Sequence, residues 1–90
     1  MNIKIYPIVK KSIDEYDFDD LLAACAPPDE YDLESERISD LITTESSIEE
    51  IASMIASVMK SSFGYLMKVD VNKIESFMEI AEKIKNDLSI

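Results

Sequence analysis

The sequence predicts an all-α protein, a compact bundle of three long helices plus a short helix after the first. Two observations predict this fold. Apolar residues recur at intervals of three and four positions along most of the chain, the spacing of one face of an α-helix. Helix start signals and helix-breaking residues separate these stretches. With 90 residues, 47% of them hydrophobic, the chain can bury one core and has no room for a second, so we expect a single domain over residues 1–90.

The first helix is expected from Ile5 to Tyr16. Its apolar face combines Ile5, Ile8, Val9, Ile13 and Tyr16. Pro7 fits into the first turn, where a residue without an amide hydrogen removes no hydrogen bond. A short turn of helix follows, built on three apolar residues, Phe18, Leu21 and Leu22. Pro27 and Pro28 then interrupt the helix, because proline supplies no amide donor, and a loop is expected from about Cys25 to Glu30.

The second helix is expected from Asp32 to about Thr43. Four apolar residues are expected to turn inward, namely Leu33, Ile38, Leu41 and Ile42. Glu34 and Glu36 lie near its start, where carboxylates suit the positive end of the helix dipole.

The third helix has the clearest start signal. Ser46 and Ser47 can each act as its N-cap, with Glu49 or Glu50 three residues further on. The apolar face that follows comprises Ile48, Ile51, Met54, Ile55, Val58 and Met59. Gly64 ends the helix, because glycine tolerates the left-handed conformation found at many helix ends.

The last helix is expected to start after Asp70, a good N-cap residue. Its apolar face comprises Ile74, Phe77, Met78, Ala81, Ile84 and Leu88. Between the third and last helices, the run from Tyr65 to Val69 is short and apolar, and both an extended connector and a helical turn fit it.

Composition excludes several chemistries. The chain contains no histidine, which removes Ser-His and Cys-His nucleophile pairs and every metal motif that needs histidine. Cys25 is the only cysteine, so no disulfide can form within the chain, and a packed structural role is expected for it. One glycine is too few for a phosphate-binding loop, and neither Asp17-Phe18-Asp19 nor the run from Asp32 to Glu36 matches a calcium-binding EF-hand loop. We therefore expect no enzymatic activity, no metal and no cofactor.

One stretch of the chain carries the whole net charge. The residues from Asp14 to Asp40, called the acidic segment below, hold eleven of the nineteen acids and a single base, Arg37, which accounts for the formal charge of −10. The other residues balance eight acids with eight lysines. Charge confined to one third of a chain is typical of a surface that binds a basic partner, and such a surface repels nucleic acid. The alternative is a solvated face that keeps the protein soluble, although crowding like charges costs stability.

Two acidic clusters flank the break at Pro27 and Pro28, with tyrosines among them. Aromatic rings among carboxylates are typical of a hot spot that docks a basic protein. We expect partner contacts at seven residues: Asp17, Asp19, Asp20, Asp29, Glu30, Tyr31 and Asp32. The carboxylates would pair with Lys or Arg of the partner, and Tyr31 would supply an apolar anchor. The alternative for Tyr31 is a ring packed back on the bundle.

Several strings in the first half of the chain resemble a known family. They are Tyr6-Pro7-Ile8-Val9, Ile13-Asp14-Glu15-Tyr16-Asp17, Leu21-Leu22 and the stretch from Ala26 to Glu34, in which Pro27 to Asp32 is the most specific part. Over about residues 3 to 45 the chain resembles the YugE-like family of small bacterial proteins. The family has tryptophan and then Asp-Pro where this chain has Tyr16-Asp17-Phe18, so the entry into the short helix can differ. The resemblance implies a small, all-helical cytoplasmic fold with no established enzymatic activity.

The resemblance extends more loosely to immunity proteins encoded beside toxins of bacterial competition systems, including contact-dependent growth inhibition. Together with the charge, it leads to our main hypothesis, an immunity protein that binds and neutralises a cognate toxin domain, expected to be a basic RNase or DNase. The alternative is a YugE-like adaptor or regulatory protein without a toxin partner. We expect a cytoplasmic protein without membrane contact, because the chain shows neither a secretory signal nor an apolar stretch of membrane-spanning length. The oligomeric state stays open.

Overall fold

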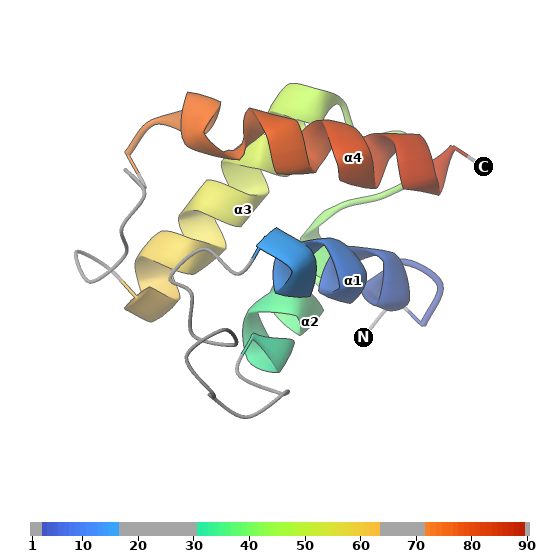
Figure 1. The fold of residues 1–90 in the computed structure, drawn as a ribbon, viewed down its shortest axis with the longest axis horizontal. Helices are drawn as coiled ribbons and strands as arrows, with labels where there is room; N and C mark the ends of the chain where they lie inside the picture. The colour runs from blue at the N-terminus through green and yellow to red at the C-terminus, as the bar shows by residue number, and fades with distance from the viewer. Residues whose placement is uncertain (1–2, 17–30, 64–71, 90) are drawn as a thin grey trace.

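The computed structural model describes residues 3–16, 31–63 and 72–89, and these residues form an all-α fold (Figure 1). The described part contains no strand, and its helices are α1 (Tyr6–Tyr16), α2 (Asp32–Leu41), α3 (Ile48–Phe63), the 3-10 turn η2 (Ile74–Phe77) and α4 (Met78–Leu88). The predicted all-α class is therefore confirmed. The short helix predicted around Phe18 to Leu22, the loop from Cys25 to Glu30 and the run from Tyr65 to Val69 lie outside the described residues.

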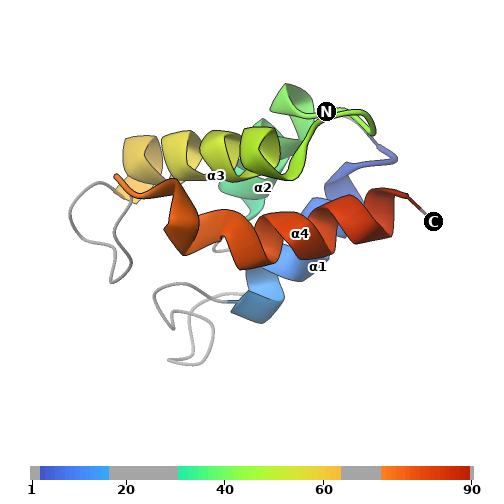
Figure 2. The ribbon, with the colours of Figure 1, turned by 90° about the horizontal axis from the view of Figure 1, so that it is seen from above.

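Each α-helix packs against two others, so that the four enclose one core. Within the described part, α1 contacts α2 and α4, α3 also contacts α2 and α4, and η2 packs against α3 and α4. In Figure 1, α4 lies alongside α1, and α3 runs obliquely behind α4; Figure 2 shows the same helices from above. Segments far apart in the sequence, such as α1 and α4, thus share one face of the molecule.

The core draws on all four helices and is rich in isoleucine. Its buried apolar members are Ile5, Val9, Ile13, Tyr31, Ile38, Ile42, Ile51, Ala52, Ile55, Val58, Met59, Phe77, Ile80, Ala81 and Ile84. Burying one large apolar side chain contributes about 1.5–3 kcal/mol, so this cluster is the main source of stability. The faces predicted for the first and third helices supply seven of these fifteen residues.

The start of α1 agrees with the prediction. The amide groups of Ile8 and Val9 both donate to the carbonyl oxygen of Ile5, each at 3.1 Å. Pro7 lies in this first turn. Amide groups in the first turn have no hydrogen-bond partner within the helix, so the missing amide hydrogen of proline costs no hydrogen bond there. The helix then buries Val9 and Ile13 against its neighbours.

The predicted capping box of the third helix is confirmed, with Ser47 as the cap. The Glu50 amide donates to Ser47 Oγ at 3.1 Å, and the Ser47 amide donates to Glu50 Oε1 at 3.1 Å. Ser46 has a different partner, because its Oγ accepts a hydrogen bond from the Thr43 amide at 2.9 Å. Reciprocal bonds of this kind satisfy two of the amides that have no partner at a helix start. The described helix runs to Phe63, and the predicted stop at Gly64 lies outside the described residues.

The inward face of α2 differs from the prediction. Ile38 and Ile42 are buried, but Leu33 and Leu41 are 56% and 53% exposed. The reason is geometric: Tyr31, Ile38 and Ile42 lie on one side of the helix, whereas Leu33 and Leu41 lie two turns apart on the other. Since only one side can face the core, three polar residues on the inner side are buried with it, namely Glu34, Ser35 and Ser39. The helix also ends earlier than expected, because Ile42 already has an extended backbone.

The last helix begins as a 3-10 turn, η2, before α4 continues from Met78. The predicted N-cap Asp70 lies outside the described residues. Of the predicted face, Phe77, Ala81 and Ile84 are buried, and the remaining members are partly buried. Ile80, which was not predicted to face inward, is also buried, since residues three and four apart share a helix face with Phe77 and Ile84.

Candidate protein-binding surface

The structure describes two of the seven predicted partner contacts. The other five lie outside the described residues: Asp17, Asp19, Asp20, Asp29 and Glu30. Tyr31 and Asp32 stand together at the start of α2, but their surroundings differ. Tyr31 is fully buried, whereas Asp32 is partly exposed.

The exposed role predicted for Tyr31 is wrong in this conformation. Its ring is 0% exposed and belongs to the core cluster, so it offers no surface to a partner. Its backbone also has a structural role, because its carbonyl oxygen accepts a hydrogen bond from the Ser35 amide at 2.9 Å. The alternative prediction, a ring packed back on the bundle, describes what the structure shows.

Asp32 is held by a lysine of α1. Lys10 Nζ lies 2.6 Å from Asp32 Oδ1 and 2.7 Å from Asp14 Oδ2, so one ammonium group joins the end of α1 to the start of α2. Hydrogen bonds to Asp14 and then to Asp32 raise the pKa of Lys10 well above its usual range. A second lysine, Lys83 of α4, forms an ion pair with Glu15. The hydrogen bond that Lys83 donates to Glu15 within this ion pair lowers the pKa of the Glu15 carboxyl.

The described acids of the acidic segment therefore fall into three groups. Asp14, Glu15 and Asp32 are paired with lysines of the bundle. Glu34 is buried, only 5% exposed, and Ser62 Oγ on α3 donates to its Oε2 at 3.5 Å. Glu36 and Asp40 remain exposed on α2. Among the described acids of the segment, the bundle's lysines thus hold Asp14, Glu15 and Asp32.

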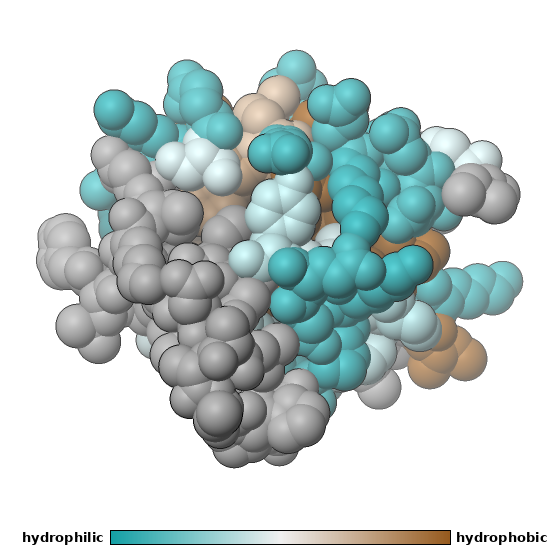
Figure 3. Space-filling view, in the orientation of Figure 1, coloured by the Kyte–Doolittle hydropathy of each residue, from teal (hydrophilic) through white to brown (hydrophobic). Residues whose placement is uncertain are grey.

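A further acidic row runs from η2 into α4, which packs against α1. Glu75, Glu79 and Glu82 are exposed, at the spacing of four and three residues that places them on one helix side. Burial raises the pKa of the half-buried Tyr16, and so does the negative charge of the Glu79 carboxylate. Hydrophilic side chains accordingly gather over α1 and α4 on the face that Figure 3 presents. Charge counting along the sequence misses this row, because nearby lysines balance it in number.

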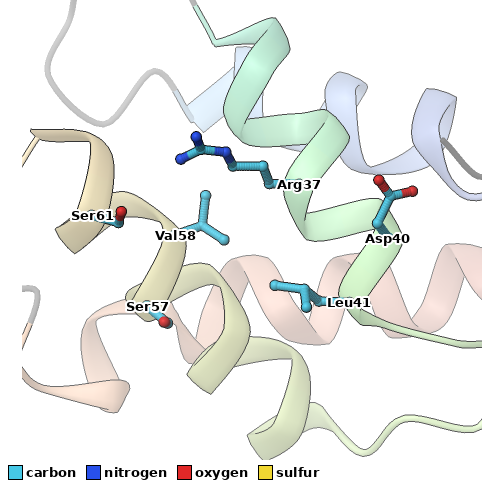
Figure 4. A pocket seen from close by; sticks show the side chains of 6 residues that line it. All are labelled: Arg37, Asp40, Leu41, Ser57, Val58 and Ser61. Carbon is cyan, nitrogen blue, oxygen red and sulfur yellow. The ribbon is translucent and has the colours of Figure 1, made fainter.

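A groove lies between α2 and α3 (Figure 4). It has a volume of about 340 Å³ and six lining residues: Arg37, Asp40, Leu41, Ser57, Val58 and Ser61. The side chains of Arg37 and Leu41 reach from α2 toward α3, and Val58 points between them, whereas the Asp40 carboxylate points away from Val58 (Figure 4). The sequence does not predict this groove, because the groove depends on how α2 and α3 are placed relative to each other. The sequence pattern also predicts that Leu41 faces the core, whereas Leu41 lines the groove.

The described residues contain neither a metal-binding cluster nor a membrane-spanning helix. Residues 3–16, 31–63 and 72–89 contain no group of three or more Asp, Glu or Cys side chains that could hold a metal ion. None of the helices described in these ranges combines the length and apolar character needed to cross a membrane. The features that the described surface does offer are carboxylates over α1 and α4 and the groove between α2 and α3.

Comparison with known proteins adds no relative: no protein-family model, curated protein or solved structure matches this chain. What the chain binds must therefore be inferred from its own surface.

Proposed function

We propose that this chain is an immunity protein, which binds a toxin domain of a bacterial competition system and neutralises it. The toxin domain is a basic RNase or DNase, and its contacts are the predicted acids of the acidic segment: Asp17, Asp19, Asp20, Asp29, Glu30 and Asp32. One observation carries the proposal: the whole formal charge of −10 is confined to the residues from Asp14 to Asp40. The looser resemblance to immunity proteins favours the same function, whereas the resemblance of residues 3 to 45 to YugE-like proteins fits the alternative, an adaptor or regulatory protein without a toxin partner, equally well.

Electrostatics explains why an acidic inhibitor suits a nuclease. A nuclease that binds RNA or DNA needs a basic cleft to hold phosphates. An acidic protein is drawn to such a cleft from a distance, associates quickly and covers the surface that the nucleic acid would occupy. Rapid capture matters because the toxin would otherwise act in the cytoplasm of the producing cell, where we place the immunity protein.

The surface near the acidic segment supports this proposal. The described end of the segment at α1 lies next to α4, since the two helices pack together and Lys83 of α4 pairs with Glu15. The negative potential over this face therefore has contributions from two regions of the sequence. A basic partner would neutralise like charges whose mutual repulsion otherwise costs stability.

A co-expression experiment tests the proposal. The probe is the C-terminal domain encoded by the reading frame immediately upstream of the gene for this chain. We expect that domain to arrest growth when expressed alone, this chain to restore growth, and the two proteins to co-purify. A basic toxin domain from an unrelated system serves as the control and should not be neutralised. If the chain neither restores growth nor binds the upstream domain, the proposal is wrong and an adaptor without a toxin partner becomes the better account.

A further inference from the structure

The groove between α2 and α3 holds the chain's only arginine. Arg37 is exposed, and it makes no hydrogen bond or ion pair with another described residue. Lys10 and Lys83, by contrast, are each held by carboxylates of the chain. Arg37 thus has its guanidinium group available although acids surround it in the sequence. A guanidinium group binds a carboxylate through two parallel hydrogen bonds, which gives such a contact direction as well as charge.

Exposed apolar surface lies beside this cation. Leu41 is 53% exposed and reaches toward α3 in the groove, while Val58 lies between Leu41 and Arg37 (Figure 4). Ser57 and Ser61 line the α3 side with hydroxyl groups. The groove therefore offers an apolar floor, an exposed cation and hydrogen-bonding side chains within one site. Arginine and apolar contacts around a central pocket are typical of the few residues that dominate binding energy at protein interfaces.

The net charge of this chain indicates which kind of molecule can occupy the groove. A second copy of this chain would bring another net charge of −10 to the interface, which disfavours self-association. A small free anion meets the same repulsion. A basic protein is attracted to the molecule as a whole, and a carboxylate on its surface can then pair with Arg37.

We propose that the α2–α3 groove receives an apolar side chain of the toxin domain, next to an Asp or Glu of that domain that pairs with Arg37. This inference rests on the proposed function and names a second contact for the same partner. The acidic surface governs how fast the two proteins meet, and the groove governs how long they stay together. Rim charges act mainly on the association rate, whereas a buried contact acts on the dissociation rate.

Binding kinetics with matched variants test the groove. The probe is a catalytically inactive form of the upstream-encoded domain, measured against the full chain at low and high salt. Arg37→Gln and Leu41→Ala should each raise the dissociation rate by about tenfold or more, with the association rate unchanged within about twofold. Ser57→Tyr, which fills the groove from an exposed position, should have the same effect.

The control variants remove a positive charge or an exposed leucine at positions outside the groove. Lys11→Gln alters the net charge as Arg37→Gln does, and Leu33→Ala removes an equally exposed leucine from α2 outside the groove. Both should leave the dissociation rate within about twofold of the wild type. Thermal unfolding of each variant shows that the fold is kept. If wild-type binding is tight but the groove variants behave like their controls, the groove inference is wrong and the proposed function stands. If the wild-type chain does not bind the domain, both fail.

Discussion

At the scale of single residues, the buried polar side chains of α2 show how packing decides burial. Ser35 and Ser39 are almost fully buried, while Leu33 and Leu41 on the same helix are exposed. Tyr31, Ile38 and Ile42 together bury more apolar area on their side of the helix than the two leucines offer on the other. The serines therefore enter the core because of their position and not because of their chemistry.

Replacing Ser35 by alanine should not destabilise the protein. Among the described residues, Ser35 Oγ is buried without a hydrogen-bond partner, and alanine is the better helix former. We expect the free energy of unfolding to rise by roughly 0.5–1 kcal/mol in urea denaturation. Ser39→Ala is the control and should gain less, because Ser39 Oγ donates to the Glu36 carbonyl at 2.8 Å. A loss of more than about 1 kcal/mol in Ser35→Ala would show that the hydroxyl group has a partner.

At the scale of helices, ion pairs connect segments that the sequence separates. Lys10 joins α1 to α2, and Lys83 joins α4 to α1. Both lysines bind carboxylates of the acidic segment: Lys10 binds Asp14 and Asp32, and Lys83 binds Glu15. The local start signals of the helices, such as the capping box of α3, act within one helix instead.

Lys10→Ala should weaken the packing of α1 against α2. It leaves Asp14 and Asp32 near each other without a cation, and Asp14 Oδ1 is already buried without a partner among the described residues. Because these side chains are partly exposed, we expect a cost of only about 1 kcal/mol, measured by urea denaturation. Lys11→Ala is the matched control: it removes the same charge from an exposed position and should cost much less. Equal costs for the two variants would contradict the bridging role of Lys10.

The capping box of α3 should make stability depend on pH through Glu50. The Ser47 amide, which donates to the Glu50 carboxylate, lowers the pKa of Glu50 from its ordinary value of 4.5. A lowered folded-state pKa stabilises the fold above the unfolded value, and this contribution is lost as the pH falls through the folded value. We therefore expect Glu50→Gln to be less stable than the wild type at neutral pH, with the difference shrinking below about pH 4.5.

Glu49→Gln provides the comparison for this pH dependence. Glu49 lies in the same first turn of α3, so its replacement removes the same charge without touching the bond to Ser47. Denaturation over a range of acidic pH values should show a smaller change for Glu49→Gln. A pH-independent difference between the wild type and Glu50→Gln would contradict the assignment.

At the scale of the whole molecule, local signals were predicted well and relative placements were not. The apolar spacing of Val9 and Ile13 and the capping pair of Ser47 and Glu50 each involve residues only a few positions apart in the sequence. The sequence therefore predicts α1 and α3 directly. The orientation of α2 depends on which of two apolar sides meets α1 and α3, and neither propensity nor charge decides that. The burial of Tyr31 and the groove around Arg37 both follow from this orientation, which explains why the anchor was misplaced and the groove missed.

The most direct test of the central claim is the salt dependence of binding between this chain and the upstream-encoded domain. The wild type should associate fast at low salt, with a rate that falls steeply as salt is added. A variant with Asp17, Asp19, Asp20, Asp29 and Glu30 replaced by Asn or Gln should associate more slowly and with a flatter salt dependence. An association rate that ignores salt, or that this variant leaves unchanged, would contradict recognition through the acidic segment.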